Sequence, residues 1–65
     1  MRGEFFMSEA DIRSKLPQAQ ADKVIEFLEK GWRFKEIEKN GDVILVGNGS
    51  YTWVKDNGHS YPVIN

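Results

Sequence analysis

The sequence predicts an α+β fold, in which a short helix and a main helix pack on one face of a four-stranded antiparallel β-meander. The C-terminal half contains three Asn-Gly pairs, at Asn40-Gly41, Asn48-Gly49 and Asn57-Gly58, each flanked by strand-forming residues. Asn-Gly is a strong hairpin signal because both residues tolerate the positive φ of a tight turn. Upstream of these pairs, apolar residues recur instead at helical spacing. Two helices followed by three hairpins are therefore expected.

The first predicted helix begins after Ser8 and runs through about Lys15. Ser8 is a favourable N-cap, and Asp11 stands at the third helical position, as in a capping box. Ile12 and Leu16, four residues apart, form its apolar side. We expect residues 1–7 to be a flexible N-terminal extension and residues 8–65 to form a single small domain.

The main predicted helix runs from Pro17 to Lys30. Proline suits the first turn of a helix, and Gly31 is the expected residue just past its end. One apolar stripe follows the helical period. Its members are Ala21, Val24, Ile25 and Leu28.

The first two hairpins are predicted to close through two-residue loops. A loop at Asn40-Gly41 places Lys39 opposite Asp42 and Ile37 opposite Ile44. A loop at Asn48-Gly49 places Gly47 opposite Ser50 and, further along, Ile44 opposite Trp53. The strand from Asp42 to Gly47 has an even number of residues, so its two ends can bond to different neighbours.

The third hairpin is predicted to have a three-residue loop at 56–58, with Gly58 in the left-handed conformation of a G1 bulge. The strand from Ser50 to Asp56 has an odd number of residues, so tight turns cannot close both of its ends. Trp53 then faces Tyr61, and Thr52 faces Pro62. Pro62 falls at a non-bonded position of an edge strand, where its missing N–H is not needed.

Alternation of side chains sorts the predicted sheet into two faces. Face one carries Arg33, Lys35, Ile37, Ile44, Val46, Tyr51, Trp53, Lys55, His59, Tyr61 and Val63. Face two carries Trp32, Phe34, Glu36, Glu38, Val43, Leu45, Thr52, Val54, Pro62 and Ile64. We expect the helix to cover face two, because covering face one would remove several basic groups from water.

The predicted binding residues lie on face one, which this arrangement leaves open. Three interpretations of this face remain. Its aromatic rings and cations could contact a protein partner or a second copy of the chain, stack single-stranded nucleic acid, or simply stabilise the strands through cross-strand pairs. The candidate residues are Arg33, Lys35, Tyr51, Trp53, Lys55 and Tyr61.

Composition narrows the classes of function. With 40% hydrophobic and 29% charged residues, the chain is of an ordinary globular type. A net charge of −1 lacks the basic excess of a duplex-DNA binder. Cysteine is absent, which suits a cytoplasmic, reducing location, and no apolar run is long enough for a membrane span. A core of this size supplies no more than roughly 3–5 kcal/mol, so oligomerisation would help the fold.

Enzymatic, metal and cofactor sites are not expected. His59 is the only histidine and lacks an evident partner or cleft, so we interpret it as an exposed structural residue. Glu36 and Glu38 are interpreted as a solvated strand end, since a structural zinc site needs four ligands. The glycines around Asn48 lead into a strand, unlike those of a phosphate-binding loop. A winged helix is disfavoured because the main helix is acidic.

Overall fold

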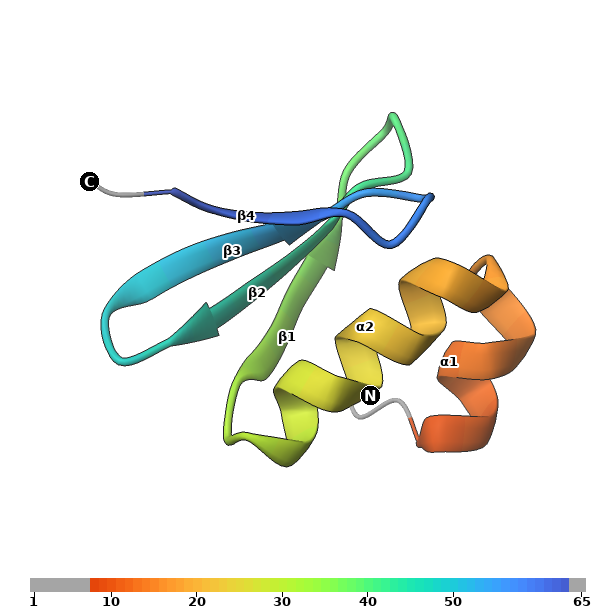
Figure 1. The fold of residues 1–65 in the computed structure, drawn as a ribbon, viewed down its shortest axis with the longest axis horizontal. Coiled ribbons are helices and arrows are strands. Elements are labelled where there is room, and N and C mark those ends of the chain that lie inside the picture. The colour runs from red at the N-terminus through yellow and green to blue at the C-terminus, as the bar shows by residue number, and fades with distance from the viewer. Residues whose placement is uncertain (1–7, 64–65) are drawn as a thin grey trace, which may run out of the picture.

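The computed structural model describes residues 8–63. The predictions for residues 1–7 and for Ile64 therefore lie outside the described residues. The elements are α1 (Glu9–Lys15), α2 (Gln18–Glu29), β1 (Arg33–Ile37), β2 (Val43–Gly47), β3 (Ser50–Val54) and β4 (Ser60–Val63). The four strands form one antiparallel sheet in the order β1-β2-β3-β4, and both helices lie on the same side of it (Figure 1). The predicted α+β meander is confirmed.

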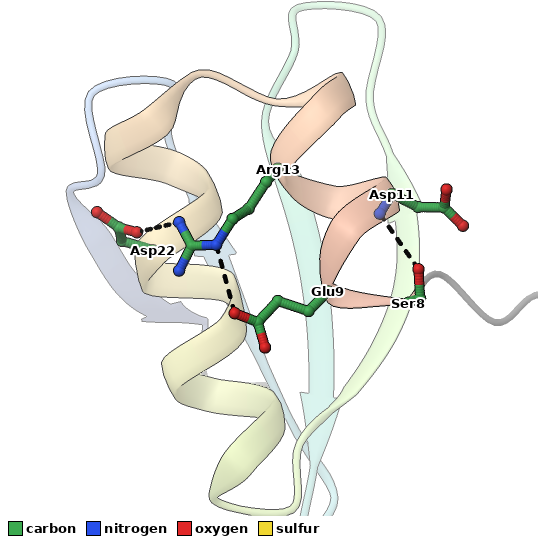
Figure 2. Close-up of polar contacts among 5 residues, drawn as sticks. All are labelled: Ser8, Glu9, Asp11, Arg13 and Asp22. Atoms are coloured by element: carbon green, nitrogen blue, oxygen red, sulfur yellow. Dashed lines mark hydrogen bonds and ion pairs between the residues drawn. The ribbon is translucent and has the colours of Figure 1, made fainter.

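Helix α1 begins as the sequence predicts. The Ser8 hydroxyl accepts a hydrogen bond from the Asp11 N–H at 3.2 Å (Figure 2), which satisfies one donor that the first turn leaves free. Leu16 ends the helix in an extended conformation. The Leu16 side chain is buried with Ile12 in the core.

Helix α2 begins one residue after Pro17, which occupies the N-cap position rather than the first turn. It ends in a Schellman motif: the Gly31 N–H donates to the Leu28 carbonyl, and the Trp32 N–H donates to the Phe27 carbonyl. Gly31 has a φ of +100°, a left-handed conformation that a side chain would disfavour. The predicted glycine stop is confirmed.

An ion-pair cluster on the surface joins the two helices. Figure 2 shows the Arg13 guanidinium between Glu9 of α1 and Asp22 of α2, and its Nη1 lies 2.6 Å from an Asp22 oxygen. The hydrogen bond to Asp22, and then the one to Glu9, raises the pKa of Arg13 above its ordinary value. Because these side chains are exposed, the cluster contributes little to stability and positions α1 against α2.

The second and third hairpins have the predicted register. Asn48 and Gly49 both have positive φ, 50° and 77°, as a type I′ turn requires. Gly47 pairs with Ser50, and Thr52 pairs with Pro62. Gly58 closes the three-residue loop: its N–H donates to the Lys55 carbonyl, while the Lys55 N–H donates to the His59 carbonyl.

The predicted register of the first hairpin is wrong by one residue. The loop has three residues, 39–41, because the Glu38 N–H donates to the Asp42 carbonyl at 2.8 Å and the Gly41 N–H donates to the Glu38 carbonyl. Ile37 accordingly pairs with Val43 rather than with Ile44. This loop repeats the geometry of the loop at 56–58, and in each the asparagine side chain accepts a hydrogen bond from the N–H two residues later.

The shift in register exchanges side chains between the faces at the end of β1. A bulge at Lys35 shifts the register by a further residue, so that Phe34 pairs with Leu45, two residues from the predicted pairing, and Arg33 and Phe34 return to their predicted faces. Beyond the bulge, Glu36 pairs with Ile44. Glu36 and Glu38 thus belong to face one and Ile37 to face two, the reverse of the prediction.

The core lies between the helices and face two, as predicted. Val43, Leu45 and Val54 of the sheet are fully buried with helix residues. Trp32 and Phe34 are half-buried against this cluster, and the Trp32 indole packs edge-on against the Phe27 ring at 5.3 Å. Trp32 also lies against Gly47, where a Cβ would stand 2.7 Å from the indole. The side of the sheet opposite to α1 and α2 is therefore not covered by any helix of residues 8–63.

Gln20 joins the start of α2 to the loop 39–41 and to the end of β3 through hydrogen bonds. Its side-chain amide donates to the Gly41 carbonyl and to the Val54 carbonyl, each at 2.8 Å. Gln20 is 1% exposed. The two hydrogen bonds satisfy the buried amide of Gln20, the buried Val54 carbonyl and the partly buried Gly41 carbonyl.

Candidate interaction surface

The uncovered side of the sheet is called the open face below, and its members follow from the strand pairing. Residues that are paired on adjacent strands have their side chains on the same side of the sheet. The pairing from β1 to β4 therefore shows which residues share the open face. Lys35 is the extra residue at the bulge that borders this face. The open face comprises Arg33, Glu36, Glu38, Ile44, Val46, Tyr51, Trp53, Lys55, His59 and Tyr61.

The Trp53 indole is held across the sheet by an acidic side chain. Its Nε1–H donates to Glu38 Oε1 at 2.9 Å. Strand β2 lies between β1 and β3, so the indole extends over β2, where Ile44 is the residue paired with Trp53. Ile44 is 4% exposed although no described helix covers this side. The indole therefore acts as a cover for Ile44.

The other aromatic rings of the open face adjoin Trp53. The Tyr51 ring meets the indole edge-on with centroids 6.3 Å apart, and Tyr61 pairs with Trp53 across the strands. The His59 ring lies 6.4 Å from the Tyr61 ring. Tyr61 is 36% exposed, while Tyr51 and Trp53 are half-buried. Because Trp53 and Tyr61 are paired, the two pairs of rings lie side by side on neighbouring strands and form an aromatic layer with part of its area in water.

Charges of both signs surround this aromatic layer. Arg33 and Lys35 are exposed on β1, and Lys55 is half-buried just after β3. Glu36 and Glu38 add negative charge at the end of β1 near the loop 39–41. The ion pairs formed among residues 8–63 join side chains of α1, α2 and Lys30 only. The charges of the open face thus have no ion-pair partner within the described chain.

The predicted binding residues are partly brought together. Tyr51, Trp53 and Tyr61 adjoin one another, and Lys55 follows on the same side of β3. Arg33 lies at the opposite end of the sheet from Lys55, since it pairs with Val46 near the tight turn. The six residues therefore border one surface but do not converge on a single point.

Sequence reasoning missed the acidic members of this surface. Glu36 and Glu38 were assigned to the covered face because the loop at 39–41 was predicted with two residues. One signal in the sequence could have found them. Lys39-Asn40-Gly41 matches Asp56-Asn57-Gly58, since in both a charged residue precedes Asn-Gly, and this match favours a three-residue loop in both hairpins.

Two further features bear on enzymatic and metal chemistry. A shallow open hollow of about 520 Å³ is lined by residues 36–40 and lies beside the aromatic layer rather than within it. Its walls lack a nucleophile paired with a base. Among residues 8–63, no three His, Cys, Asp or Glu side chains gather closely enough to hold a metal ion.

The two edges of the sheet are poorly suited to pairing with another strand. On β1, the bulge at Lys35 interrupts the regular ladder. On β4, Pro62 pairs with Thr52 next to the bonded pair formed by Trp53 and Tyr61, so its missing N–H falls on the outer edge. Bulges and edge prolines are devices that hinder strand addition. The open face is therefore better suited to contact than the edges are.

Comparison with known proteins adds no identification. No family model, no curated protein and no solved structure matches this chain. Across residues 8–63, every helix is too short or too polar to cross a bilayer.

Proposed function

We propose that this protein is a small non-enzymatic binding module whose open face contacts another protein surface. The observation that carries the proposal is the aromatic layer of Tyr51, Trp53 and Tyr61 on the side of the sheet that α1 and α2 do not cover. Tyrosine, tryptophan and arginine dominate the energetics of protein interfaces. We further propose a cytoplasmic location, since a chain without cysteine suits a reducing compartment.

The geometry of Trp53 supports this proposal. Its indole is already fixed by Glu38 on one side and by the Tyr51 ring on the other. A side chain that is held before binding loses less conformational entropy when the complex forms. Tyr61 projects beside it with 36% of its surface exposed, which makes Tyr61 the most accessible anchor.

Binding of single-stranded nucleic acid is the second candidate function. The rings of Tyr51 and Tyr61, with cations at Arg33, Lys35 and Lys55, are the features that favour it, because bases stack on rings and phosphates meet cations. Glu36 and Glu38 on the same face oppose it by repelling phosphate. Protein contact is therefore the first proposal.

A titration with single-stranded oligonucleotide, followed by tryptophan fluorescence, distinguishes these two candidate functions. Stacking of bases should quench the tryptophan fluorescence when single-stranded oligonucleotide is added, and added salt should weaken the binding steeply. An unchanged spectrum at low salt would exclude the nucleic-acid candidate. It would leave protein contact as the function to be tested.

Matched capture experiments test protein contact. The wild-type chain and a Tyr61→Asp variant are immobilised and exposed to the same cell extract, and bound proteins are compared by mass spectrometry. The control is Gln18→Asp, which makes the same kind of charge change at an exposed position of α2. We expect specific captured proteins to be lost with Tyr61→Asp and retained with Gln18→Asp. Equal capture by all three chains would contradict the proposal.

A further inference from the structure

We propose that the partner of the open face is a second copy of this chain, bound face to face about a two-fold axis that runs parallel to the strands. This inference rests on the proposed function and names its partner. It is carried by the distribution of charge across the sheet, by the blunted edges and by the small size of the core.

At the end of the sheet that holds the loops 39–41 and 56–58, the charges of the open face are divided between its two sides, whereas Arg33 lies on β1 at the opposite end. Glu36 and Glu38 lie on β1 at the end of the sheet near loop 39–41. Lys55 and His59 face each other between β3 and β4, where the Lys55 N–H donates to the His59 carbonyl. Val43, which begins β2, pairs with Val54, which ends β3. The two acids and the Lys55–His59 pair therefore lie at the same end of the strands. Acidic groups therefore stand on one side of the aromatic layer and Lys55 with His59 on the other.

This division is complementary to itself under one kind of two-fold rotation. An axis parallel to the strands, passing between β2 and β3, places β1 of one copy over β4 of the other and keeps the same ends together. Glu38 then lies over His59 of the second copy and Glu36 over Tyr61, with Lys55 on the neighbouring strand beside them, twice by symmetry. Complementary charges favour this orientation.

The alternative two-fold axis brings like charges together as well as opposite ones. An axis perpendicular to the strands and parallel to the sheet places each strand over its own equivalent. With this axis at Ile44, the second residue of β2, Glu36 would meet Glu36 of the second copy, while Glu38 would lie over Arg33. Like charges placed opposite one another are destabilising. The axis parallel to the strands avoids this contact.

The size of the sheet limits the strength of the pairing. Four strands about 4.8 Å apart, with about five residues of roughly 3.3 Å rise, give a flat area of about 300 Å² per copy. A stable interface buries about 800 Å² per partner. The dimer should therefore form only at high protein concentration. Even weak pairing would help a chain of 65 residues whose core is small.

Charge-swap variants test the inference by sedimentation. The wild type should be a monomer at about 10 μM and move towards a dimer near 1 mM, a range that brackets weak affinities. Lys55→Glu and Glu36→Lys should each remain monomeric, because each places like charges together in a homodimer. An equimolar mixture of the two variants should associate about tenfold more tightly than either alone, since opposite charges then meet at both symmetric contacts.

Matched controls keep the result interpretable. Glu29→Lys on α2 and Lys15→Glu on α1 make the same charge changes away from the open face and should dimerise like the wild type. Circular dichroism checks that every variant is folded. Glu36 has no hydrogen bond to Trp53, so its replacement leaves the Trp53–Glu38 contact in place.

The outcomes separate this inference from the proposed function. A wild type that stays monomeric at every concentration, or a mixture that associates no better than its components, would overturn the second copy as partner. If proteins are nevertheless captured in a manner that depends on Tyr61, the binding module stands with a different partner. If both experiments fail, both proposals fall.

Discussion

Gln20 is a polar residue that occupies a place in the core. Its side chain is fully buried because its amide donates to two backbone carbonyls, those of Gly41 and Val54. The burial of Gln20 is not predictable from the sequence, because a glutamine beside an apolar stripe is indistinguishable there from an exposed helical residue. Its two hydrogen-bond acceptors become evident only when the positions of the loop 39–41 and the end of β3 are known.

Replacing Gln20 should therefore destabilise the protein. We expect Gln20→Ala to lower the free energy of unfolding by about 1–3 kcal/mol, since the buried Val54 carbonyl and the partly buried Gly41 carbonyl lose their donor. Chemical denaturation measures the change. Gln18→Ala, at an exposed position of the same helix, is the control and should have little effect. Equal stabilities of the two variants would show that the hydrogen bonds of Gln20 are dispensable.

Gly41 and Gly58 occupy equivalent positions in two similar loops but have different surroundings. Both have positive φ, +95° and +88°. A Cβ at Gly41 would meet open space, whereas a Cβ at Gly58 would lie 2.9 Å from the Ala19 carbonyl oxygen of α2. The loop at 56–58 thus packs directly against the helix.

This difference predicts unequal effects of the same substitution. Gly41→Ala should cost about 1–2 kcal/mol from the left-handed backbone alone. Gly58→Ala should cost more, because the backbone of α2 must also move away. Thermal or chemical denaturation of the two variants compares them directly. A smaller effect at Gly58 than at Gly41 would contradict the described packing.

The hydrogen bond between Trp53 and Glu38 makes a third prediction about single residues. In a Trp32→Phe background, where Trp53 is the only fluorophore of its kind, Glu38→Ala should increase quenching by acrylamide because the indole loses its acceptor. Glu38→Gln keeps an acceptor oxygen and should stay close to the parent. Unchanged quenching in both variants would argue that the indole is held by packing alone.

At the scale of the elements, helix caps and two of the three turns were predictable, while the first hairpin was not. The Ser8 cap and the Gly31 stop follow from local chemistry that needs no tertiary partner. In the first hairpin, Asp42 belongs to the hydrogen-bonded pair that closes the loop, whether the loop has two or three residues. The even number of residues from Asp42 to Gly47 could not choose between Lys39 and Glu38 as its partner.

Because the length of the first hairpin loop was ambiguous, the residues of the open face could be predicted only in part. The aromatic members on β3 and β4 were predictable because the odd number of residues from Ser50 to Asp56 determined the third loop. The acidic members on β1 were not, since a one-residue change of register moves a side chain to the other face. The bulge at Lys35, which returns Arg33 and Phe34 to their predicted faces, has no local signal in the sequence.

Helix α2 carries an acid-sensitive contact on its exposed side. Hydrogen bonding by Lys23, and more weakly by Lys30, lowers the pKa of Glu26 from its ordinary value of 4.5. A lowered folded pKa stabilises the fold above the unfolded value, and this contribution is lost as the pH falls through the folded value. Glu26→Gln should therefore reduce the loss of stability between about pH 5 and pH 3, by a small amount that salt screens. Identical pH profiles would contradict this contact.

At the scale of the whole molecule, the sheet separates two aromatic environments. Trp32 joins the helices and the core on one side, and Trp53 lies on the open face. The fold could be predicted from the sequence because helical and strand periods are distinct along the chain. The charge pattern of the open face could not, because it depends on how the strands are aligned.

The two indole N–H signals in a ¹⁵N NMR spectrum recorded over a concentration series provide the most direct test of the open face as the contact surface. Each tryptophan reports on a different side of the sheet, so Trp32 is an internal control for Trp53. We predict that the Trp53 signal shifts or broadens as concentration rises, while the Trp32 signal stays in place. A Trp32 signal that moves while Trp53 does not, or two signals that never change, would contradict self-contact through the open face.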